Sequence, residues 1–340
     1  MVRSSIMEEN SAGGKIMDNQ ISFTDMEYSQ RNHKTKREEF LDIMSEIIPW
    51  DEWVKLVEPY YPVRGKRGCQ PKEIETMLRM LLLQSWFNLS DEGVEDAIYD
   101  SYAMKRFMEL DFTNTPVPDA TTLCRFRKRL TENGIQQRIF DAICRFMDER
   151  GKIMHGGTIV DATIIEAPES KKNAKHERAP EMHSVRKHTK WYFGMRIGVG
   201  VDAGTGYVHH ITGYSANRAE IKASPDLLRE DDEVVYGDAA YLDMEKYVQD
   251  NIRRDYRICR NMGVYQRFRK GELSYQLEKK MVELPKQRIR RKVEYVFHIV
   301  KDIFHWRKVR YKRIQKNTAY ANILFASANL YMCAKAGGLA

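Results

Sequence analysis

The feature that most constrains the fold is a short run of mainly β-branched residues, TIVDATII, at positions 158–165. A glycine precedes the run and a proline follows it closely, and the run is too short to cross a membrane or to form a typical buried helix. It therefore predicts a strand that is buried on both faces. Asp161 does not suit such a strand: it shares a face with Ile159 and Thr163, and a buried carboxylate is costly unless it is paired or binds a cation.

The residues before this strand have the periodicity of helices. Residues 1–34 are polar and lack the apolar residues of a core, so they predict a mobile arm. From residue 35 to residue 150, apolar side chains recur at spacings of three and four, which predicts an all-helical domain. Ser90 and Asp119 suit the N-cap positions of two of its helices. We expect helices at about residues 35–48, 71–86, from 90 onward and 120–131.

After residue 151 the pattern changes to strands and then alternates between strands and helices. The glycine-rich turn at 202–207 predicts a hairpin rather than a nucleotide-binding loop, because no helix follows it. Three strands compatible with antiparallel pairing, then alternating helices and strands, predict a mixed α/β sheet with helices on its faces. We assign residues 151–340 to this domain, with a basic insertion at about 261–286. Besides 158–165, strands are expected at 191–201, 207–213, 233–238 and 256–260, and helices at about 219–229, 242–252 and 288–301.

Positive charge is concentrated in the last quarter of the chain. The whole chain has a net charge of +8, whereas residues 251–340 contain 22 Lys and Arg against 6 Asp and Glu, a net of +16. A field of this sign favours a polyanionic partner, and nucleic acid is the most common one. The alternative is a solvated basic surface without a partner, but the many arginines, which suit bidentate contacts with phosphates, favour nucleic acid.

The sequence also argues against several classes of protein. It has no run of eighteen or more apolar residues and no apolar signal core at the N-terminus, so we expect a cytoplasmic protein without a membrane partner. Its 5 cysteines are scattered, with no C-x-x-C pair and no grouping with histidines. This pattern argues against a disulfide framework and a zinc site, and it favours ordinary reduced thiols.

Two further acids occupy positions that suit a cation site. Asp238 follows Val-Val-Tyr-Gly at the carboxyl end of an expected strand, where open α/β sheets place their sites, and Glu294 lies in the helix expected at 288–301. For either aspartate alone, a structural hydrogen-bonding role at a strand end is the favoured interpretation. Together with Asp161, however, they would provide hard oxygen ligands for two Mg²⁺ or Mn²⁺ ions, which can activate water for attack on a phosphodiester.

Helical geometry explains why one acid stands among the cations of residues 288–301. At about 100° per residue, Arg290, Glu294 and Lys301 fall on one face, beside an apolar stripe that should face the core. The acid would then hold the metal, while the two cations would hold the phosphates of a nucleic acid.

A second group of candidate DNA contacts lies on the helix expected at 120–131. Its short neighbours are compatible with a helix-turn-helix arrangement, although basic faces are also common on surface helices that bind nothing. The candidate contacts on this helix are Arg125, Arg127, Lys128 and Arg129.

Residues 170–190 hold 7 Lys and Arg against 2 Glu and predict a mobile cationic loop, in which Lys187 and Lys190 are candidate DNA contacts. Trp191 is a candidate for stacking on an unpaired base. The alternative, which we favour for Trp191 and Tyr192 as a pair, is a core aromatic pair at the start of a strand. A metal cluster is a weaker alternative for the three histidines of this segment, His176, His183 and His188.

These motifs together resemble those of the bacterial insertion-sequence transposases that carry an Asp-Asp-Glu triad on a ribonuclease-H-like fold. The match looks closest to the family named after insertion sequence five. The resemblance rests on VDATIIEAP around Asp161, WYFGMRIGVGVD at 191–202, YGDAAY around Asp238, and the spacing of Arg290, Glu294 and Lys301, which is that of the family's arginine-glutamate-lysine signature. It extends into the helical half through PKEIETMLRMLLLQSWFNLSD and PDATTLCRFRKRL.

The resemblance implies a ribonuclease-H-like catalytic domain in which Asp161, Asp238 and Glu294 bind two divalent ions and Arg290 and Lys301 contact DNA near the scissile phosphate. It implies binding of the element's terminal inverted repeats, hydrolysis of a phosphodiester at each end, and transfer of the 3′-hydroxyl into target DNA. A homodimer or larger synaptic complex, associated with the nucleoid, is implied as well.

Two departures from the family pattern concern contacts with the DNA backbone. Related signatures often have a tyrosine where this chain has Gln287, and a lysine or glycine where this chain has Ala239. Both departures leave the three carboxylates in place.

Two other functions would use the same fold. A catalytically silent DNA-binding regulator of related elements is disfavoured because all three carboxylates and both signature cations are present. A different nuclease, such as a junction resolvase, is disfavoured by the basic helical domain and by the spacing of the signature.

Overall fold

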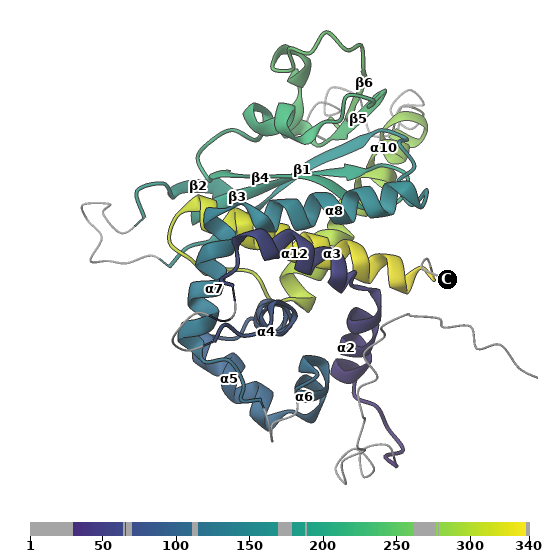
Figure 1. The fold of residues 1–340 in the computed structure, drawn as a ribbon. Helices are drawn as coiled ribbons and strands as arrows, with labels where there is room; N and C mark the ends of the chain where they lie inside the picture. Colours follow the sequence, from purple (N-terminus) through teal and green to yellow (C-terminus); the bar gives the residue numbers. More distant parts are fainter. Residues whose placement is uncertain are drawn as a thin grey trace, which may run out of the picture.

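A helical part and a mixed sheet make up the computed structural model, which describes residues 30–63, 65, 70–110, 115–168, 179–187, 189–260, 277 and 279–337 (Figure 1). The helical part is the first half of the chain, as the sequence predicts. Its elements are α2 (Lys36–Ile47), α3 (Trp50–Val57), a 3₁₀ turn (Glu58–Tyr60), α4 (Ile74–Trp86), α5 (Asp91–Asp100), α6 (Tyr102–Met108), α7 (Ala120–Glu132) and α8 (Ile135–Glu149).

Local signals in the sequence determine where these helices begin. The side chains of Thr35, Ser90 and Asp119 each accept a hydrogen bond from a backbone N–H in the first turn of α2, α5 and α7, and so satisfy donors that the helix leaves unpaired. Helix α4 is buried along its whole length from Thr76 to Trp86, because it is apolar on nearly all sides and lies at the centre of this part.

The second half forms a six-stranded sheet in the order β2-β3-β1-β5-β6, with β4 paired to β3. Strand β1 is antiparallel to β3 and parallel to β5, so the predicted mixed sheet is confirmed. The predicted hairpin between β3 and β4 is also confirmed. The strands are β1 (Thr158–Glu166), β2 (His183–Lys187), β3 (Lys190–Asp202), β4 (Val208–Ser215), β5 (Val234–Gly237) and β6 (Asp255–Ile258), of which β2 was not predicted.

Three predicted helices differ from those in the structure. Residues 219–229 form only a 3₁₀ element, η2 (Glu220–Leu227), which contains Pro225, a residue that cannot donate the backbone hydrogen bond of an α-helix. Residues 242–252 contain only the 3₁₀ turn η4 (Met244–Lys246), flanked by left-handed residues at Asp243 and Asn251. The helix predicted at 288–301 is divided at Arg291 into α10 (Leu284–Arg290) and α11 (Lys292–His298), and it ends in the π-helical turn η7 (Ile299–Ile303).

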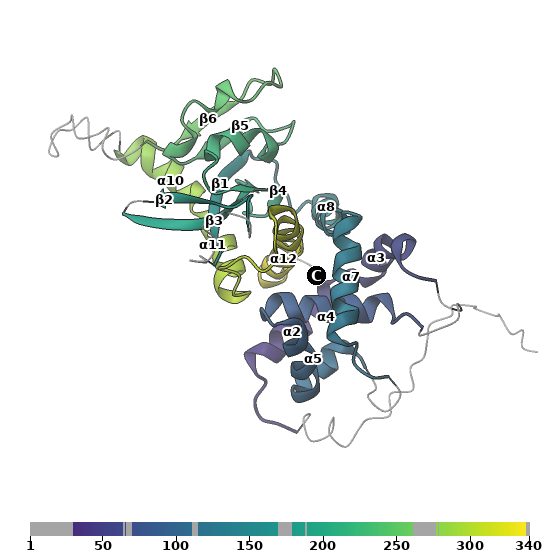
Figure 2. The ribbon, with the colours of Figure 1, turned by 90° about the vertical axis from the view of Figure 1, so that its left-hand side faces the viewer.

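A long helix that the sequence did not predict, α12 (Ile314–Lys335), joins the two halves of the molecule. Figure 2 shows α12 between the sheet and the helical part. The Tyr320 hydroxyl donates to the carbonyl of Ser85 in α4 at 3.0 Å, and the side chain of Asn322 donates to that of Gln137 in α8 at 2.8 Å. One apolar cluster accordingly runs from Leu41 in α2 to Cys333 in α12, and a smaller one fills the opposite face of the sheet.

Candidate active site

The two aspartates predicted to bind a cation lie beside each other on neighbouring strands. Strand β1 pairs in parallel with β5, with Thr158 opposite Val235 and Ile159 opposite Tyr236. The same offset along both strands places Asp161 opposite Asp238, which directly follows β5. Because opposite residues of paired strands point to the same side of a sheet, both carboxylates lie on one face of it, at the carboxyl end of β5 and part-way along β1.

Asp161 is a largely buried acid whose charge has few compensating contacts. Its side chain is 13% exposed and accepts hydrogen bonds from Arg290 Nη1 at 2.9 Å and from the backbone N–H of Ala162 at 2.8 Å. The pKa of the Asp161 carboxyl is raised to about 7, mainly by burial and in smaller part by the nearby charges of Asp238 and Glu220, although Arg290 and the N–H of Ala162 lower it. This site would therefore be stabilised by additional positive charge.

Asp238 lines an open cleft of about 680 Å³. Its carboxylate accepts a hydrogen bond from the N–H of Ala240 at 2.9 Å and caps the 3₁₀ turn η3 (Ala239–Tyr241), which fixes its position after β5. Other residues that line the cleft are Lys187, Gln287 and Arg290. Gln287, which replaces the tyrosine common in related signatures, therefore lies in the same cleft as Asp238.

Glu294 reaches the site through Arg290. The guanidinium of Arg290 donates to Asp161 from Nη1, and from Nη2 it pairs with Glu294 Oε1 at 3.3 Å. The carboxylate of Glu294 is 59% exposed, and that of Asp161 is largely buried. One arginine thus bridges two of the three carboxylates that the sequence predicted as metal ligands.

The chemistry of this donor set suits a hard divalent cation. Carboxylate oxygens are the ligands that Mg²⁺ and Mn²⁺ prefer, and the buried charge of Asp161 beside Asp238 favours a cation between them. In the described part of the chain, no three His, Cys, Asp or Glu side chains converge closely enough to enclose a metal. Arg290 supplies the positive charge, so binding of a metal by Asp161 and Glu294 would require its guanidinium to move away.

The sequence predicted that Arg290, Glu294 and Lys301 share one helical face. Arg290 and Glu294 do lie on one face, since they form an ion pair. Lys301 lies in the π-helical turn η7, beyond the end of α11, so the helical wheel does not extend to it. Burial lowers the pKa of the Lys301 ammonium, and the nearby cations Arg307 and Lys187 lower it further. The acids Asp302 and Glu166 oppose this decrease.

The structure corrects the prediction that Arg127 of α7 contacts DNA. Its guanidinium is only 13% exposed, donates to both carboxylate oxygens of Asp91 at 2.8 and 2.9 Å, and stacks on the ring of Tyr311. Arg127 is therefore a structural residue that links α7 to α5 and to the segment before α12. Arg125 and Lys128 are exposed, and Arg129 is half-buried beside the ring of Tyr61.

The predicted loop at 170–190 is in part a strand. Residues 183–187 form β2, which pairs with the start of β3 and presents Lys187 and Lys190 on the surface. Trp191 is 62% exposed, so the interpretation of Trp191 as part of a core pair was wrong, and its indole remains available for stacking. In the suggested histidine cluster, His183 is exposed, and His176 and His188 lie outside the described residues.

Sequence reasoning missed a fourth acid near the two aspartates. Glu220 begins η2, is half-buried, and forms an ion pair with Arg196 of β3. Burial raises the pKa of the Glu220 carboxyl, and Asp238 is among the nearby charges that raise it further. Nothing in the sequence marked Glu220, because its approach to Asp238 depends on how η2 packs under the sheet.

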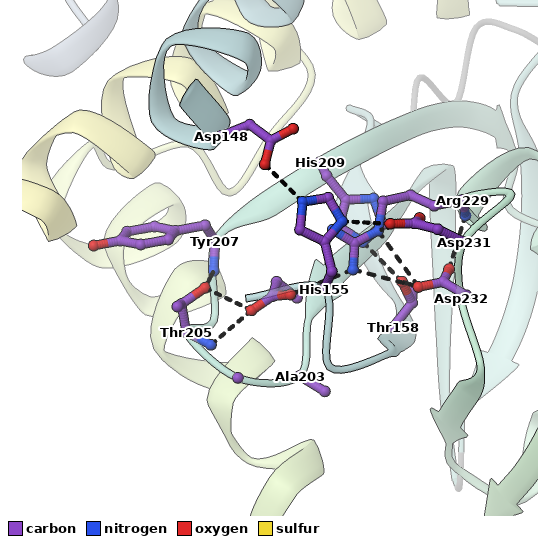
Figure 3. Close-up of polar contacts among 12 residues, drawn as sticks. Asp148, His155, Thr158, Ala203, Thr205, Tyr207, His209, Arg229, Asp231 and Asp232 are labelled. Atoms are coloured by element: carbon purple, nitrogen blue, oxygen red, sulfur yellow. Dashed lines mark hydrogen bonds and ion pairs between the residues drawn. The ribbon is translucent and has the colours of Figure 1, made fainter. Parts of the chain in front are cut away.

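A separate polar cluster lies at the start of β1 (Figure 3). Thr158 donates to Asp232 at 2.7 Å and contacts His209 at 2.9 Å, and Arg229 forms ion pairs of 3.3 Å with both Asp232 and Asp202. Burial lowers the pKa of His209 well below its usual value, so this imidazole is neutral. The acids in this cluster are paired, which identifies a structural network that fixes the start of the strand bearing Asp161.

Comparison with protein families agrees with this geometry. A family model described as a transposase DDE domain matches residues 153–330, more than half of the chain. The chain belongs to the DDE-domain transposases. A second model, described as a transposase domain (DUF772), matches residues 28–129 of the transposase, which is most of its helical part. No solved structure matches the chain. The insertion-sequence transposase suggested by the motifs and its ribonuclease-H-like mixed fold are thereby confirmed, whereas the narrower family named after insertion sequence five stays a prediction.

Among the described residues, no helix is long and apolar enough to cross a membrane.

Proposed function

We propose that this transposase binds the terminal inverted repeats of its own insertion sequence, cuts a phosphodiester at each end, and transfers the 3′-hydroxyl into target DNA. The observation that carries the proposal is the juxtaposition of Asp161, part-way along β1, with Asp238, directly after the parallel strand β5, and the contacts of Arg290 with Asp161 and Glu294. Family membership supports the reaction class, since DDE-domain transposases act on DNA with divalent metal ions.

Asp161, Asp238 and Glu294 would hold two Mg²⁺ or Mn²⁺ ions. When bound, such ions lower the pKa of an attacking water or hydroxyl and stabilise the leaving oxygen. Arg290, released from the acids, would bind a non-bridging oxygen of the scissile phosphate, because its planar guanidinium suits bidentate contact with phosphate. Lys301 and Lys187 would hold the neighbouring phosphates, and Gln287 would contact the backbone within the cleft that it shares with Asp238.

The same proposal assigns contacts with the rest of the DNA. The exposed cations Arg125 and Lys128 of α7, with Arg129 beside them, would bind the duplex, and Lys190 and Trp191 of the β2–β3 hairpin would hold DNA near the cut. Two ends must be joined in one event, so the active form would be a homodimer or larger synaptic complex in the cytoplasm, associated with the nucleoid.

Incubation of purified protein with a plasmid that carries the DNA flanking its reading frame tests this function. We expect metal-dependent cuts at the two inverted repeats, their loss with chelator, and their loss by more than about 1,000-fold in Asp161→Asn and Asp238→Asn variants that still bind the DNA. Specific binding without any metal-dependent cutting would instead support the catalytically silent regulator.

A further inference from the structure

The segment 305–313, HWRKVRYKR, lies between η7 and α12, and the structure describes all of its residues. Outside the predicted signature, it is the most cationic stretch that is described in full. It contains 5 Lys and Arg and no acid. The sequence predicted positive charge in this part of the chain but gave it no position. In the fold, this segment connects β1, the strand that carries Asp161, to the helical part.

One end of this cationic segment is fixed to the strand that carries Asp161. The backbone N–H of Glu166, the last residue of β1, donates to the carbonyl of Arg307 at 3.2 Å, and the N–H of Val309 donates to the carbonyl of Glu166 at 2.8 Å. Lys308 lies between these two hydrogen bonds, in a parallel bridge with Glu166. The segment therefore pairs in parallel alongside the carboxyl end of β1.

The other end of the cationic segment is fixed by a buried amide of α12. The side chain of Asn317 accepts hydrogen bonds from the N–H groups of Arg310 and Tyr311 at 3.0 and 3.2 Å, and it donates to the carbonyls of Tyr311 and Arg313 at 2.6 and 2.8 Å. Arg310 donates in turn to Asn88 and to the carbonyl of Leu89, in the turn between α4 and α5. With both ends held, the backbone presents its outward side chains in fixed positions.

The outward side chains of the cationic segment are exposed cations. Lys308, Lys312 and Arg313 are exposed and have no ion-pair partner among the residues that the structure describes. Arg307 pairs with Asp302 but is 67% exposed. Like charges held close together on a rigid backbone repel one another, and this repulsion is relieved when an anion binds.

The cations continue from this segment in two directions. Towards the catalytic site, Arg307 is close enough to Lys301 to lower the pKa of its ammonium, and so is Lys187 of β2. Towards the helical part, Lys316 in the first turn of α12 lines the same small cavity as Lys128 of α7. The segment thus bridges the catalytic cleft and the basic helix.

We propose that residues 305–313 form a phosphate-binding surface for the duplex next to the scissile phosphate, which it aligns between the catalytic carboxylates and α7. This inference rests on the proposed function for the identity of the scissile phosphate. The contacts are with the DNA backbone and carry no sequence information, because the aromatic side chains of the segment, Trp306 and Tyr311, face inward.

Salt-dependent binding of a labelled duplex of arbitrary sequence, about 40 base pairs long, measures these phosphate contacts directly. The test variant is Lys308→Ala/Lys312→Ala/Arg313→Ala. The control removes the same charge from three exposed cations of α2, α3 and α8, in Lys36→Ala/Lys55→Ala/Arg145→Ala. We expect the slope of log K against log salt to fall by roughly 0.9 for each phosphate that the test variant no longer neutralises, up to about 2.7 in total, and to stay unchanged in the control.

A slope in the test variant equal to that of the control would overturn the proposal. A photo-crosslinker at position 312 checks the location: we expect crosslinks within one helical turn of the cut, and crosslinks confined to distant positions would also overturn it. The outcome is separable from that of the proposed function. If the wild-type protein binds DNA but never cuts it, the slopes still decide whether this surface exists.

Discussion

Arg290 contacts two of the proposed metal-binding acids in the structure. Its guanidinium donates to the buried carboxylate of Asp161 and pairs with Glu294. Without this partner, the desolvated charge of Asp161 beside Asp238 would be more costly still. The residue types and the spacing of the signature predicted that Arg290 and Glu294 share a face, but they could not predict that the arginine occupies the space between the acids.

Replacement of Arg290 separates its two roles. In Arg290→Gln we expect Mn²⁺ to bind the DNA-free protein several-fold more tightly, because the metal no longer competes with the guanidinium. We expect cleavage of DNA to fall by at least about 100-fold, because the variant has no guanidinium to hold the phosphate. Titration calorimetry with Mn²⁺ measures the first effect. Weaker Mn²⁺ binding in the variant would show that Arg290 supports the metal site instead of competing for it.

Arg127 of α7 shows that the sequence alone cannot separate a structural arginine from one that binds DNA. Arg127 stands in a run of cations and could not be distinguished from its neighbours by sequence. Only the approach of Asp91 and Tyr311, which are distant in the chain, identifies it as structural. Trp191 was misinterpreted for the complementary reason, since an aromatic residue at the start of a strand is exposed or buried according to what packs on that edge.

Among the elements, those with strong local signals were predicted well and those shaped by packing were not. The β-branched run of β1, the start of α2 and the capped starts of α5 and α7 were identified from sequence. The segments at 219–229 and 242–252 have helical apolar spacing, but Pro225 and the left-handed residues Asp243 and Asn251 prevent α-helices. Helix α12 was missed because it is buried on nearly all sides and mixes polar and apolar residues around its circumference, which leaves no amphipathic period to detect.

Asn317 is expected to hold the cationic segment before α12 in place. Asn317→Ala would leave buried backbone groups of residues 310–313 without partners and lower the free energy of unfolding by about 2–4 kcal/mol. Denaturant unfolding measures this decrease. Gln315→Ala, at an exposed position of the same helix, should change stability by less than about 0.5 kcal/mol, and equal effects of the two substitutions would contradict the assigned role.

His155 connects α8 to the loop before β5 and should make stability depend on pH. Its Nε2 contacts Asp148 at 2.6 Å and its Nδ1 contacts Asp231, and the hydrogen bond to Asp148 is the main cause of a raised pKa, which Arg229 partly opposes. Because the folded pKa lies above the unfolded value, the stabilisation is complete below the unfolded pKa and is lost as pH rises through the folded one.

We therefore expect His155→Gln to lower the melting temperature in mildly acidic buffer and to have little effect in alkaline buffer. The effect should be modest, because His155 is 41% exposed and solvent screens its ion pairs. Thermal melts of both proteins across this pH range measure it. A difference that stays constant with pH would rule out the protonated imidazole as its source.

In the whole molecule, the sheet and α11 carry the three proposed metal-binding acids, and α12 connects the sheet to the helical part through one continuous core. The motifs predicted the class of fold, and they gave candidate residues for the site, because metal chemistry requires particular residue types at positions that the fold brings together. They could not predict the shared core or the path of cations from Lys187 to Lys128, because both depend on contacts between segments far apart in the chain.

Metal-specific rescue of cleavage tests most directly whether Asp161, Asp238 and Glu294 hold the catalytic ions. Each is replaced by cysteine in turn, and cleavage of a duplex carrying the inverted repeat is measured in Mg²⁺ and in Mn²⁺, with Glu220→Cys as a neighbouring control. We predict that the three variants are inactive in Mg²⁺ and regain activity in Mn²⁺, because a thiolate binds the softer ion better, whereas the control shows no such difference between metals. Equal losses in both metals for folded, DNA-binding Asp161 and Asp238 variants would contradict the account.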